Sequence, residues 1–345
     1  MNRGNGLRAR QNRAAQVLIV GAGVVGTATG NGLTKKGHQV SYVDVNPERL
    51  ASLRAEGHTA TPAAEANWDE VDIVMLAVST PSLNGRIVLE PIESAASDIG
   101  HGLASKDDFT CIVVRSTVPP STTEKRLAPI LEAASGKRVG TDFGIAMNPE
   151  FLRQRSAVKD FERPWITVIG TSDYHTSQML NALYAPFGGL IINCTPTEAE
   201  MIKYVNNIFN ALKISYFNEV HQICEALGID SNLVGAVVAR SAEGMWNPLY
   251  GIRGGVPYGG ACLPKDTTAF LDFCRSNGWS HVMLEATIEV NQKLQSRIPA
   301  ATSPDEIDGI LAHTIADVPQ AMTVVTQANG SQGSPQYEQQ SPVSG

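Results

Sequence analysis

Three closely spaced glycines directly after a short apolar run constrain the fold of this 345-residue chain more than any other feature. Residues 17–20 are all apolar, as in a buried parallel strand. Gly21, Gly23 and Gly26 follow at once and open a helical pattern, and a second strand-like run has Asp44 near its end. This order predicts a dinucleotide-binding unit: a strand, a glycine turn, a helix, a second strand and an acidic residue.

A dinucleotide accounts for each position of this pattern. The first glycine allows the tight turn, the second lets a pyrophosphate approach backbone N–H groups, and the third lets the helix pack closely on the sheet. Asp44 would accept hydrogen bonds from the adenine ribose and repel a 2′-phosphate, which favours NAD over NADP, although Arg49 lies nearby. A glycine turn without a ligand is the alternative. The predicted cofactor residues here are Gly21, Gly23, Val24, Val25, Gly26, Asp44 and Arg49.

Further apolar runs of strand length recur along the first half of the chain. They lie at residues 73–78, 110–114, 144–147 and 166–169, with helical or loop segments between them. Alternating strands and helices predict an α/β fold with a doubly wound, parallel, Rossmann-like sheet.

The pattern changes near residue 195. Thr197 and Glu200 have the spacing of a capping box, and no Gly or Pro interrupts the helical pattern from there until Gly228. We therefore predict one long helix within an all-α central domain, suited to joining two domains or lining a dimer interface. The predicted organisation is a disordered extension (1–16), a Rossmann domain (17–195), a helical domain (196–300) and a mostly disordered tail (301–345).

Composition argues against several classes of protein. The net charge of −7 is unlike that of a nucleic-acid-binding protein, which usually shows a basic face. No apolar run approaches the roughly 18 residues needed to span a membrane, and the Arg-rich start lacks the apolar stretch of a secretory signal. The five cysteines are widely spaced, so we predict no metal site and no disulfide framework, but reduced thiols in the cytoplasm.

A second chemical signal is the segment Gly259-Gly260-Ala261-Cys262-Leu263-Pro264-Lys265-Asp266. The glycines let the backbone bend and approach a ligand, and a nearby cation favours the thiolate form of a cysteine. Asp266 can hold a water or act as a base. These features suit a covalent cysteine nucleophile. Taken alone, however, Cys262 is better explained as a buried structural cysteine beside a tight turn.

Four further segments give the cysteine motif a context. They are Val78-Ser79-Thr80-Pro81, Arg115-Ser116-Thr117-Val118-Pro119-Pro120, Asn148-Pro149-Glu150-Phe151-Leu152-Arg153, and Lys203 with Asn207 on the long helix. In this order, and together with the cysteine motif, they resemble the UDP-glucose/GDP-mannose dehydrogenase family over roughly residues 17–297.

The resemblance implies a four-electron oxidation, in which two NAD⁺ in succession convert the C6 alcohol of a nucleotide-bound sugar to a carboxylate. Cys262 would attack the intermediate aldehyde to give a thiohemiacetal, and then a thioester that is hydrolysed. Lys203 would stabilise the developing oxyanion, with Asn207 one turn further on the same helix face. Asp266 and Thr117 would position or activate water, and Glu150 would act in hydrolysis of the thioester near the nicotinamide.

The resemblance also implies binding residues and partners. At the cofactor it adds Thr80, Thr117, Glu150 and Lys265. At the sugar or nucleotide-sugar substrate it implies Phe151, Leu152, Arg153, Lys203, Asn207, Arg253 and Gly259. The long helix is the core of the dimer in this family, so we expect a homodimer.

The chain departs from the family's pattern in three places. A third domain that grips the nucleotide is expected to begin near residue 300 and needs about 100 residues, more than the chain has left, so a partner could supply it. Arg253 lies in a run unlike the family's Arg-Ile-Gly pattern, and Trp165-Ile166 stand where many members have Asp-Arg. Two alternatives therefore stay open: a catalytically silent NAD-binding subunit or regulatory paralogue, and a two-electron hydroxyacid or alcohol dehydrogenase.

Overall fold

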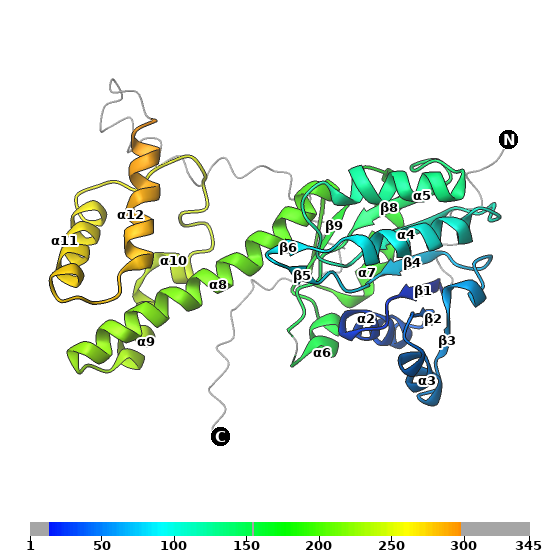
Figure 1. Cartoon of the computed structure of the whole chain (residues 1–345), viewed down its shortest axis with the longest axis horizontal. Helices are drawn as coiled ribbons and strands as arrows, with labels where there is room; N and C mark the ends of the chain where they lie inside the picture. Colours follow the sequence, from blue (N-terminus) through cyan, green and yellow to red (C-terminus); the bar gives the residue numbers. More distant parts are fainter. Residues whose placement is uncertain (1–13, 154, 298–345) are drawn as a thin grey trace, which may run out of the picture. The chain divides into compact units, whose positions relative to one another are not determined.

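The computed structural model describes residues 14–153 and 155–297 (Figure 1). They form two compact units, the first ending at Pro196 and the second beginning at Thr197. Apart from residues 14–16, the expected N-terminal extension and the expected C-terminal tail lie outside the described residues.

The first unit is built on an eight-stranded sheet with the order β10-β9-β8-β7-β4-β1-β2-β3. Its strands are β1 (Gln16–Val20), β2 (Gln39–Val43), β3 (Thr59–Thr61), β4 (Ile73–Leu76), β7 (Thr110–Val114), β8 (Phe143–Met147), β9 (Ile166–Gly170) and β10 (Leu190–Cys194). Its helices are α2 (Val24–Lys35), α3 (Pro47–Ala55), α4 (Glu90–Leu103), α5 (Ala128–Ser135), α6 (Ala157–Glu162) and α7 (Tyr174–Tyr184). A small hairpin, β5 (Ser82–Leu83) and β6 (Arg86–Ile87), and three short helical turns (Ala63–Glu65, Thr123–Leu127 and Ala185–Phe187) complete it.

The predicted Rossmann-like sheet is confirmed, and six of its strands, from β3 to β8 in the sheet order, run parallel. One strand departs from the parallel arrangement: β9 pairs with β8 in the antiparallel sense and with β10 in the parallel sense. The connection from β8 to β9 carries only the short helix α6, which packs against α2. Strand β9 therefore begins at the edge of the sheet at which β8 ends.

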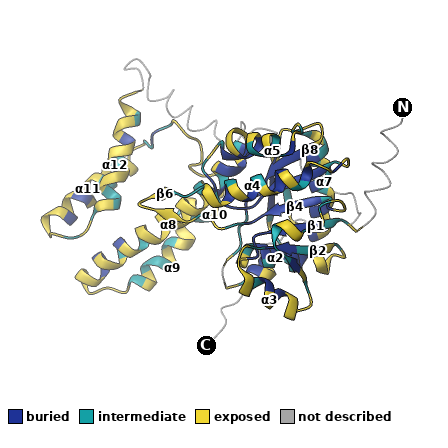
Figure 2. Cartoon of the chain, turned by 45° about the vertical axis from the view of Figure 1, so that its right-hand side comes forward, coloured by how far each residue is buried: buried dark blue, intermediate teal, exposed yellow. Residues whose placement is uncertain are grey.

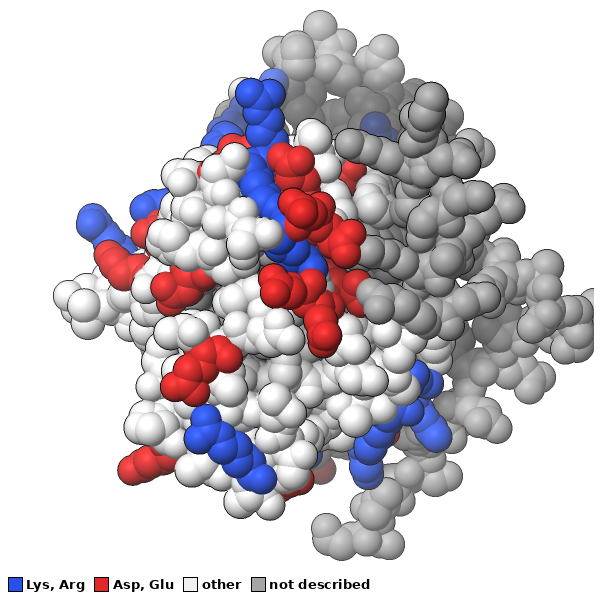
Figure 3. Space-filling view, turned by 90° about the vertical axis from the view of Figure 1, so that its right-hand side faces the viewer, with Lys and Arg blue, Asp and Glu red and all other residues white. Residues whose placement is uncertain are grey.

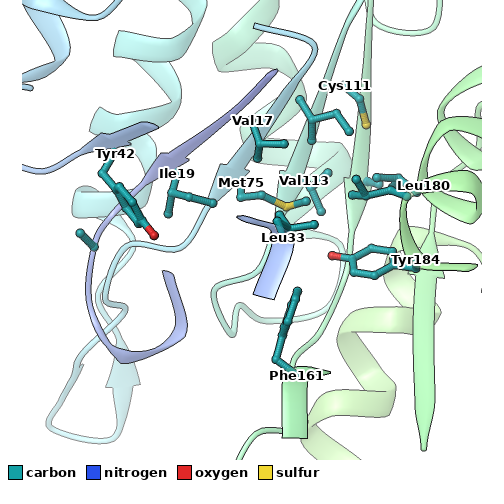
Figure 4. Close-up of a cluster of buried hydrophobic side chains, with 14 of the residues drawn as sticks. Val17, Ile19, Leu33, Tyr42, Met75, Cys111, Val113, Phe161, Leu180 and Tyr184 are labelled. Carbon is teal, nitrogen blue, oxygen red and sulfur yellow. The ribbon is translucent and has the colours of Figure 1, made fainter. Parts of the chain in front are cut away.

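The core of this unit lies between the central strands and the helices that cover them (Figure 4). Every residue of β4 and β7 is buried, which is why their sequences are continuous apolar runs rather than alternating ones. Ile19 and Met75 of the sheet and Leu33 of α2 are 0% exposed. Each such side chain stabilises the fold by about 1.5–3 kcal/mol relative to leaving it in water.

The parallel strands place the functional loops. The carboxyl ends of β1, β2, β4, β7 and β8 meet at one edge of the sheet, where ligands of open α/β sheets bind. The loops at this edge begin with Gly21, Asp44, Ala77, Arg115 and Asn148.

The second unit is helical. It contains α8 (Pro196–Leu227), α9 (Ser231–Ser241), α10 (Glu243–Trp246), α11 (Leu263–Ser276) and α12 (Val282–Gln295). The predicted long helix is confirmed, since α8 has 32 residues and ends before Gly228. The predicted capping box is wrong because α8 already begins at Pro196. Proline suits the first helical position, so Thr197 lies inside the first turn instead of capping it.

Glu219 ties α8 to α12. Its carboxylate is 9% exposed and accepts hydrogen bonds from the backbone N–H groups of Met283 (3.1 Å) and Leu284 (3.4 Å). These groups lie in the first turn of α12, where backbone donors have no partner within the helix. The buried carboxylate thus acts as a cap supplied by another element.

Exposure differs between the two units (Figure 2). The strands of the sheet are mostly buried, whereas α8, α9, α11 and α12 are largely exposed. On the face in Figure 3, acidic and basic side chains lie side by side, so neither sign of charge dominates there.

Candidate active site

A cleft of about 960 Å³ opens at the carboxyl edge of the sheet. It is lined by residues from several loops, which include most of the predicted cofactor residues of the first unit: Gly21, Gly23, Val24, Val25, Asp44, Thr80, Thr117 and Glu150. The structure therefore brings together residues that lie far apart in the sequence. A volume of this size is at the upper end of the range of small-molecule sites.

The three glycines meet different requirements. A Cβ on Gly26 would lie 2.0 Å from the carbonyl oxygen of Gly21, and one on Gly21 would lie 2.7 Å from the backbone of Ala77. Gly21 also has a φ of +94°, which disfavours other residues. A Cβ on Gly23, by contrast, would meet nothing within 4 Å and would project from an exposed residue that lines the cleft.

Packing inside the protein therefore explains the glycines at 21 and 26 but not the one at 23. Open space at the start of α2, next to backbone N–H groups without helical partners, suits an anion that approaches closely. The residues present thus fit the pyrophosphate of a dinucleotide.

Asp44 and Arg49 brace the glycine turn. The Asp44 carboxylate accepts hydrogen bonds from the N–H groups of Ala22 (2.7 Å) and Asn46 (2.9 Å). The Arg49 guanidinium donates to the carbonyl oxygen of Ala22 (2.7 Å) and to Thr27 Oγ1 (2.6 Å). Each carboxylate oxygen can accept a further hydrogen bond, so Asp44 can support the turn and bind a ribose at the same time.

A second cavity, of about 890 Å³, adjoins the same turn and contains cations that the sequence analysis missed. Arg155 and Lys159 line it together with Gly23, Asp44 and Arg49. Arg155 and Lys159 precede and open the short helix α6, which packs on α2. No sequence motif links them to the glycine turn, so only the fold reveals them.

Two loops of the cleft are joined directly. Thr80 Oγ1 donates to the carbonyl oxygen of Thr117 (2.7 Å), and Ser116 Oγ donates to that of Val78 (2.6 Å). The Glu150 carboxylate accepts from the N–H group of Leu152 (2.7 Å). The sequence places Thr80, Thr117 and Glu150 in three separate segments, and the fold brings all three to the same cleft.

Arg153, predicted at the substrate, is engaged by an acidic side chain. Its Nη2 and backbone N–H donate to the Asp160 carboxylate at 2.6 Å and 2.9 Å, and its guanidinium carbon lies 5.9 Å from the centre of the Trp165 ring. Hydrogen bonds from Arg153 hold the pKa of Asp160 well below its usual range. Phe151 and Leu152 line a small cavity of about 40 Å³ beside Trp165.

The second unit carries the other predicted catalytic residues, in two groups. Lys203, 5% exposed, and Asn207 lie one turn apart on α8. Cys262 directly precedes α11, whose first turn holds Lys265 and Asp266, joined by an exposed ion pair of 2.6 Å. The backbone N–H group of Asp266 donates to the carbonyl oxygen of Cys262 (2.8 Å), which closes this turn. Arg253 and Gly259 belong to the loop between α10 and α11.

Among the thiols, Cys262 is the exposed one. The expectation from its motif alone, a buried structural cysteine, is wrong in this respect. Cys111, Cys224 and Cys274 are buried, and burial raises the pKa of the Cys111 and Cys274 thiols. A buried thiol is held in its unreactive form, so Cys262 is the better placed nucleophile.

Two features are absent from residues 14–153 and 155–297. No helix there is both long and apolar enough to cross a membrane. No group of His, Cys, Asp and Glu side chains in this part of the chain is arranged to hold a metal ion.

Comparison with protein-family models gave matches in both units. Residues 54–188 match the model of the UDP-glucose/GDP-mannose dehydrogenase family, NAD binding domain, and residues 197–293 match that family's central domain. A further model, NADP oxidoreductase coenzyme F420-dependent, matches residues 16–91, which include the glycine turn.

Several characterised proteins are similar to the chain. A GDP-mannose 6-dehydrogenase of Pseudomonas putida is 38% identical over 74% of this chain and 63% of its own length. The UDP-glucose 6-dehydrogenase AglM of Haloferax volcanii is 36% identical over 82% of this chain and 71% of its own. The crystal structure of a ternary complex of GDP-mannose dehydrogenase from Pseudomonas aeruginosa superposes with a TM-score of 0.77, at 33% identity, over 81% of this chain and 68% of that one. The chain thus spans slightly less than two thirds of the first of these relatives.

Proposed function

Because the chain belongs to the UDP-glucose/GDP-mannose dehydrogenase family, we propose that it oxidises the C6 alcohol of a nucleotide-bound hexose to a carboxylate. The observation that carries this proposal is the cleft in which the glycine turn meets Thr117 and Glu150. The family's NAD-binding domain is present, and NAD⁺ supplies the chemistry by accepting one hydride in each of two stages.

In the first stage, the alcohol loses a hydride and a proton and becomes an aldehyde. The Cys262 thiol then adds to the aldehyde carbon, which gives a thiohemiacetal. In the second stage this carbon loses its hydride, the hydroxyl group loses its proton, and a thioester results. Water attacks the thioester carbonyl, the carbon–sulfur bond breaks, and the products are the carboxylate, the Cys262 thiol and a proton. The exposure of Cys262 supports its role.

The remaining residues supply charge and water. Lys203 donates to the oxygen that becomes negative in each stage, and Asn207 assists from the same helix face. One such donor is often worth about 10²–10³ in rate. Asp266 and Thr117 position water, and Glu150 takes its proton during thioester hydrolysis. Lys265, paired with Asp266, holds the turn that carries Cys262.

We also propose that two copies associate through α8. Met201, Val205, Phe209, Leu212 and Tyr216 are between 49% and 60% exposed. Their spacing of three or four residues aligns them as one apolar stripe along the helix. Lys203 and Asn207 lie on roughly the opposite side of α8, given about 3.6 residues per turn. A second copy of the chain can therefore cover the stripe without covering the catalytic pair.

The first test is the number of NADH molecules formed per sugar consumed, with NAD⁺ and a panel of GDP- and UDP-hexoses. Free sugars and sugar phosphates in the same panel show how much of the nucleotide is required. Two NADH per sugar support the four-electron reaction, and one indicates a two-electron dehydrogenase. NAD⁺ binding without any NADH formation points instead to a silent subunit.

Cys262→Ser tests the covalent stage, with Cys224→Ser as a matched control at a buried thiol. We expect acid formation by Cys262→Ser to fall by at least about 10³, because an alcohol is a far weaker nucleophile than a thiolate. Cys224→Ser should keep its turnover. Full acid production by Cys262→Ser contradicts the thioester mechanism.

A further inference from the structure

Arg115 is a buried cation to which the proposed reaction assigns no role. It directly follows β7 and is 4% exposed. In the described part of the chain its guanidinium has no carboxylate partner, and its Nε, also buried, has no hydrogen-bond partner. The ring of Phe161 lies 5.4 Å from the guanidinium carbon and supplies a cation–π contact. Burying an unpaired cation is unfavourable, which calls for a reason to keep it.

The guanidinium belongs to a closed hydrogen-bond network. Arg115 Nη1 donates to Asn148 Oδ1 and to the Tyr184 hydroxyl (3.1 Å). Tyr184 donates in turn to Asn148 Oδ1 (2.6 Å), and burial raises the pKa of Tyr184, so its hydroxyl keeps the proton that it donates. Asn148 Nδ2 donates to the carbonyl oxygen of Val168 (2.6 Å). Both ends of the Asn148 amide are therefore fixed.

This network fixes the residues that carry Glu150. Asn148 is followed by Pro149, whose ring restricts φ, and Glu150 comes next. The Glu150 carboxylate accepts from the N–H group of Leu152, on its other side. The turn is thus held at Asn148 and again at Leu152, and Glu150 has little freedom between them.

Arg115 also lies at two cavities that contain Glu150. One is the main cleft, which it lines together with Thr117 and Glu150. The other is the small cavity of about 40 Å³, which Arg115 lines with Asn148 and Glu150. The lining is mostly apolar, but Arg115 and Glu150 offer polar partners there. A space of this size is large enough for a water molecule, which needs at least about 10–15 Å³. A water here is a natural partner for the unsatisfied Nε.

We propose that Arg115 is a positioning residue for thioester hydrolysis. It fixes the turn that bears Glu150, and its charge orients a water held beside that carboxylate. This inference rests on the proposed function, in which Glu150 takes the proton of the attacking water. Arg115 touches neither the thioester nor the cofactor in this scheme. It acts through Asn148 and Glu150, and the two hydride transfers do not depend on it.

Rapid mixing of enzyme, nucleotide sugar and NAD⁺ separates the stages. In Arg115→Met we expect a burst of two NADH per subunit, followed by turnover at least about 10²-fold slower than in the wild-type enzyme. Intact mass measurement should find the acyl group on Cys262 during the slow phase. NAD⁺ affinity, measured by titration, should change by less than about twofold, because the glycine turn is untouched. Arg115→Lys, which keeps the charge, should recover about tenfold of the lost rate.

A purely structural role predicts a different pattern. The inference is overturned if Arg115→Met loses both the NADH burst and its affinity for NAD⁺. It is also overturned if Arg115→Met turns over at the wild-type rate. If Arg115→Met does not fold, Arg115→Lys decides: an unchanged burst with slowed turnover supports the proposal, and wild-type turnover contradicts it. A wild-type enzyme that releases one NADH per sugar instead contradicts the proposed function itself, and this inference falls with it.

Discussion

Gly23 and Gly26 are separated by three positions yet meet different demands, and a matched pair of alanine variants distinguishes them. Gly23→Ala adds a methyl group to the open cleft, so we expect about tenfold or greater loss of NAD⁺ affinity with an unchanged Tm. Gly26→Ala forces a methyl group against the carbonyl of Gly21, so we expect destabilisation by about 1–3 kcal/mol. Equal losses of stability in both variants contradict the assignment of Gly23 to the ligand. Titration with NAD⁺ and thermal unfolding measure the two effects.

The Arg153–Asp160 pair gives a pH dependence. Because hydrogen bonds from Arg153 lower the pKa of Asp160 in the folded state, the pair stabilises the protein above the unfolded pKa of about 4. This stability is lost as the pH falls below that value. We expect the difference in Tm between the wild-type protein and Asp160→Asn to be largest near pH 7 and to shrink from about pH 4 downward. A difference that grows with acidity contradicts this sign.

Single residues show where sequence reasoning succeeds and where it ends. Gly21 and Asp44 belong to a pattern with fixed spacing, and the fold brings both into one cleft. The carboxylate that holds Arg153 could not be predicted, because Asp160 lies seven residues away across an irregular loop. Arg115 belongs to one of the segments that resemble the family, but its role depends on Tyr184, which is distant in sequence. Such partners are determined by the path of the chain through space.

Helix α8 presents two different sides, and this arrangement gives a prediction about assembly. Phe209→Glu places a charge in the exposed apolar stripe, so we expect dissociation of the proposed dimer and at least about a hundredfold weaker self-association. Asn210→Glu, at the next exposed position but away from the stripe, is the control and should leave association unchanged. Sedimentation equilibrium of both variants measures the effect. A dimer in Phe209→Glu as stable as in the control shows that another surface holds the subunits together.

Elements buried on both faces were the predictable ones. The run at residues 110–114 coincides with β7, because continuous apolar residues are what a central parallel strand requires. The edge strands β3 and β10 were missed since they bury little and contain polar residues such as Thr59 and Asn193. The direction of β9 was also missed. Strand direction depends on where the connecting segment packs, which local sequence does not encode.

At the scale of the whole molecule, the residues that line the cofactor cleft belong to the first unit. NAD⁺ alone should therefore stabilise this unit, by about 2.7 kcal/mol at a concentration one hundred times its dissociation constant. Hydrogen exchange is the measurement: amides of α2 and of the loops after β4 and β7 should slow, whereas those of α11 and α12 should not. The substrate, added second, should protect α11. Protection of α11 by NAD⁺ alone contradicts a cofactor site confined to the first unit.

The two sides of α8 also restrict how this chain can change length. One residue inserted between Lys203 and Phe209 turns everything after it by about 100° around the helix axis. Lys203 and the apolar stripe would then no longer face opposite directions, although no side chain had been replaced. Substitutions can alter either side independently, but a single-residue insertion or deletion alters the angle between them. Homologous chains should therefore vary in composition along this stretch while keeping its number of residues.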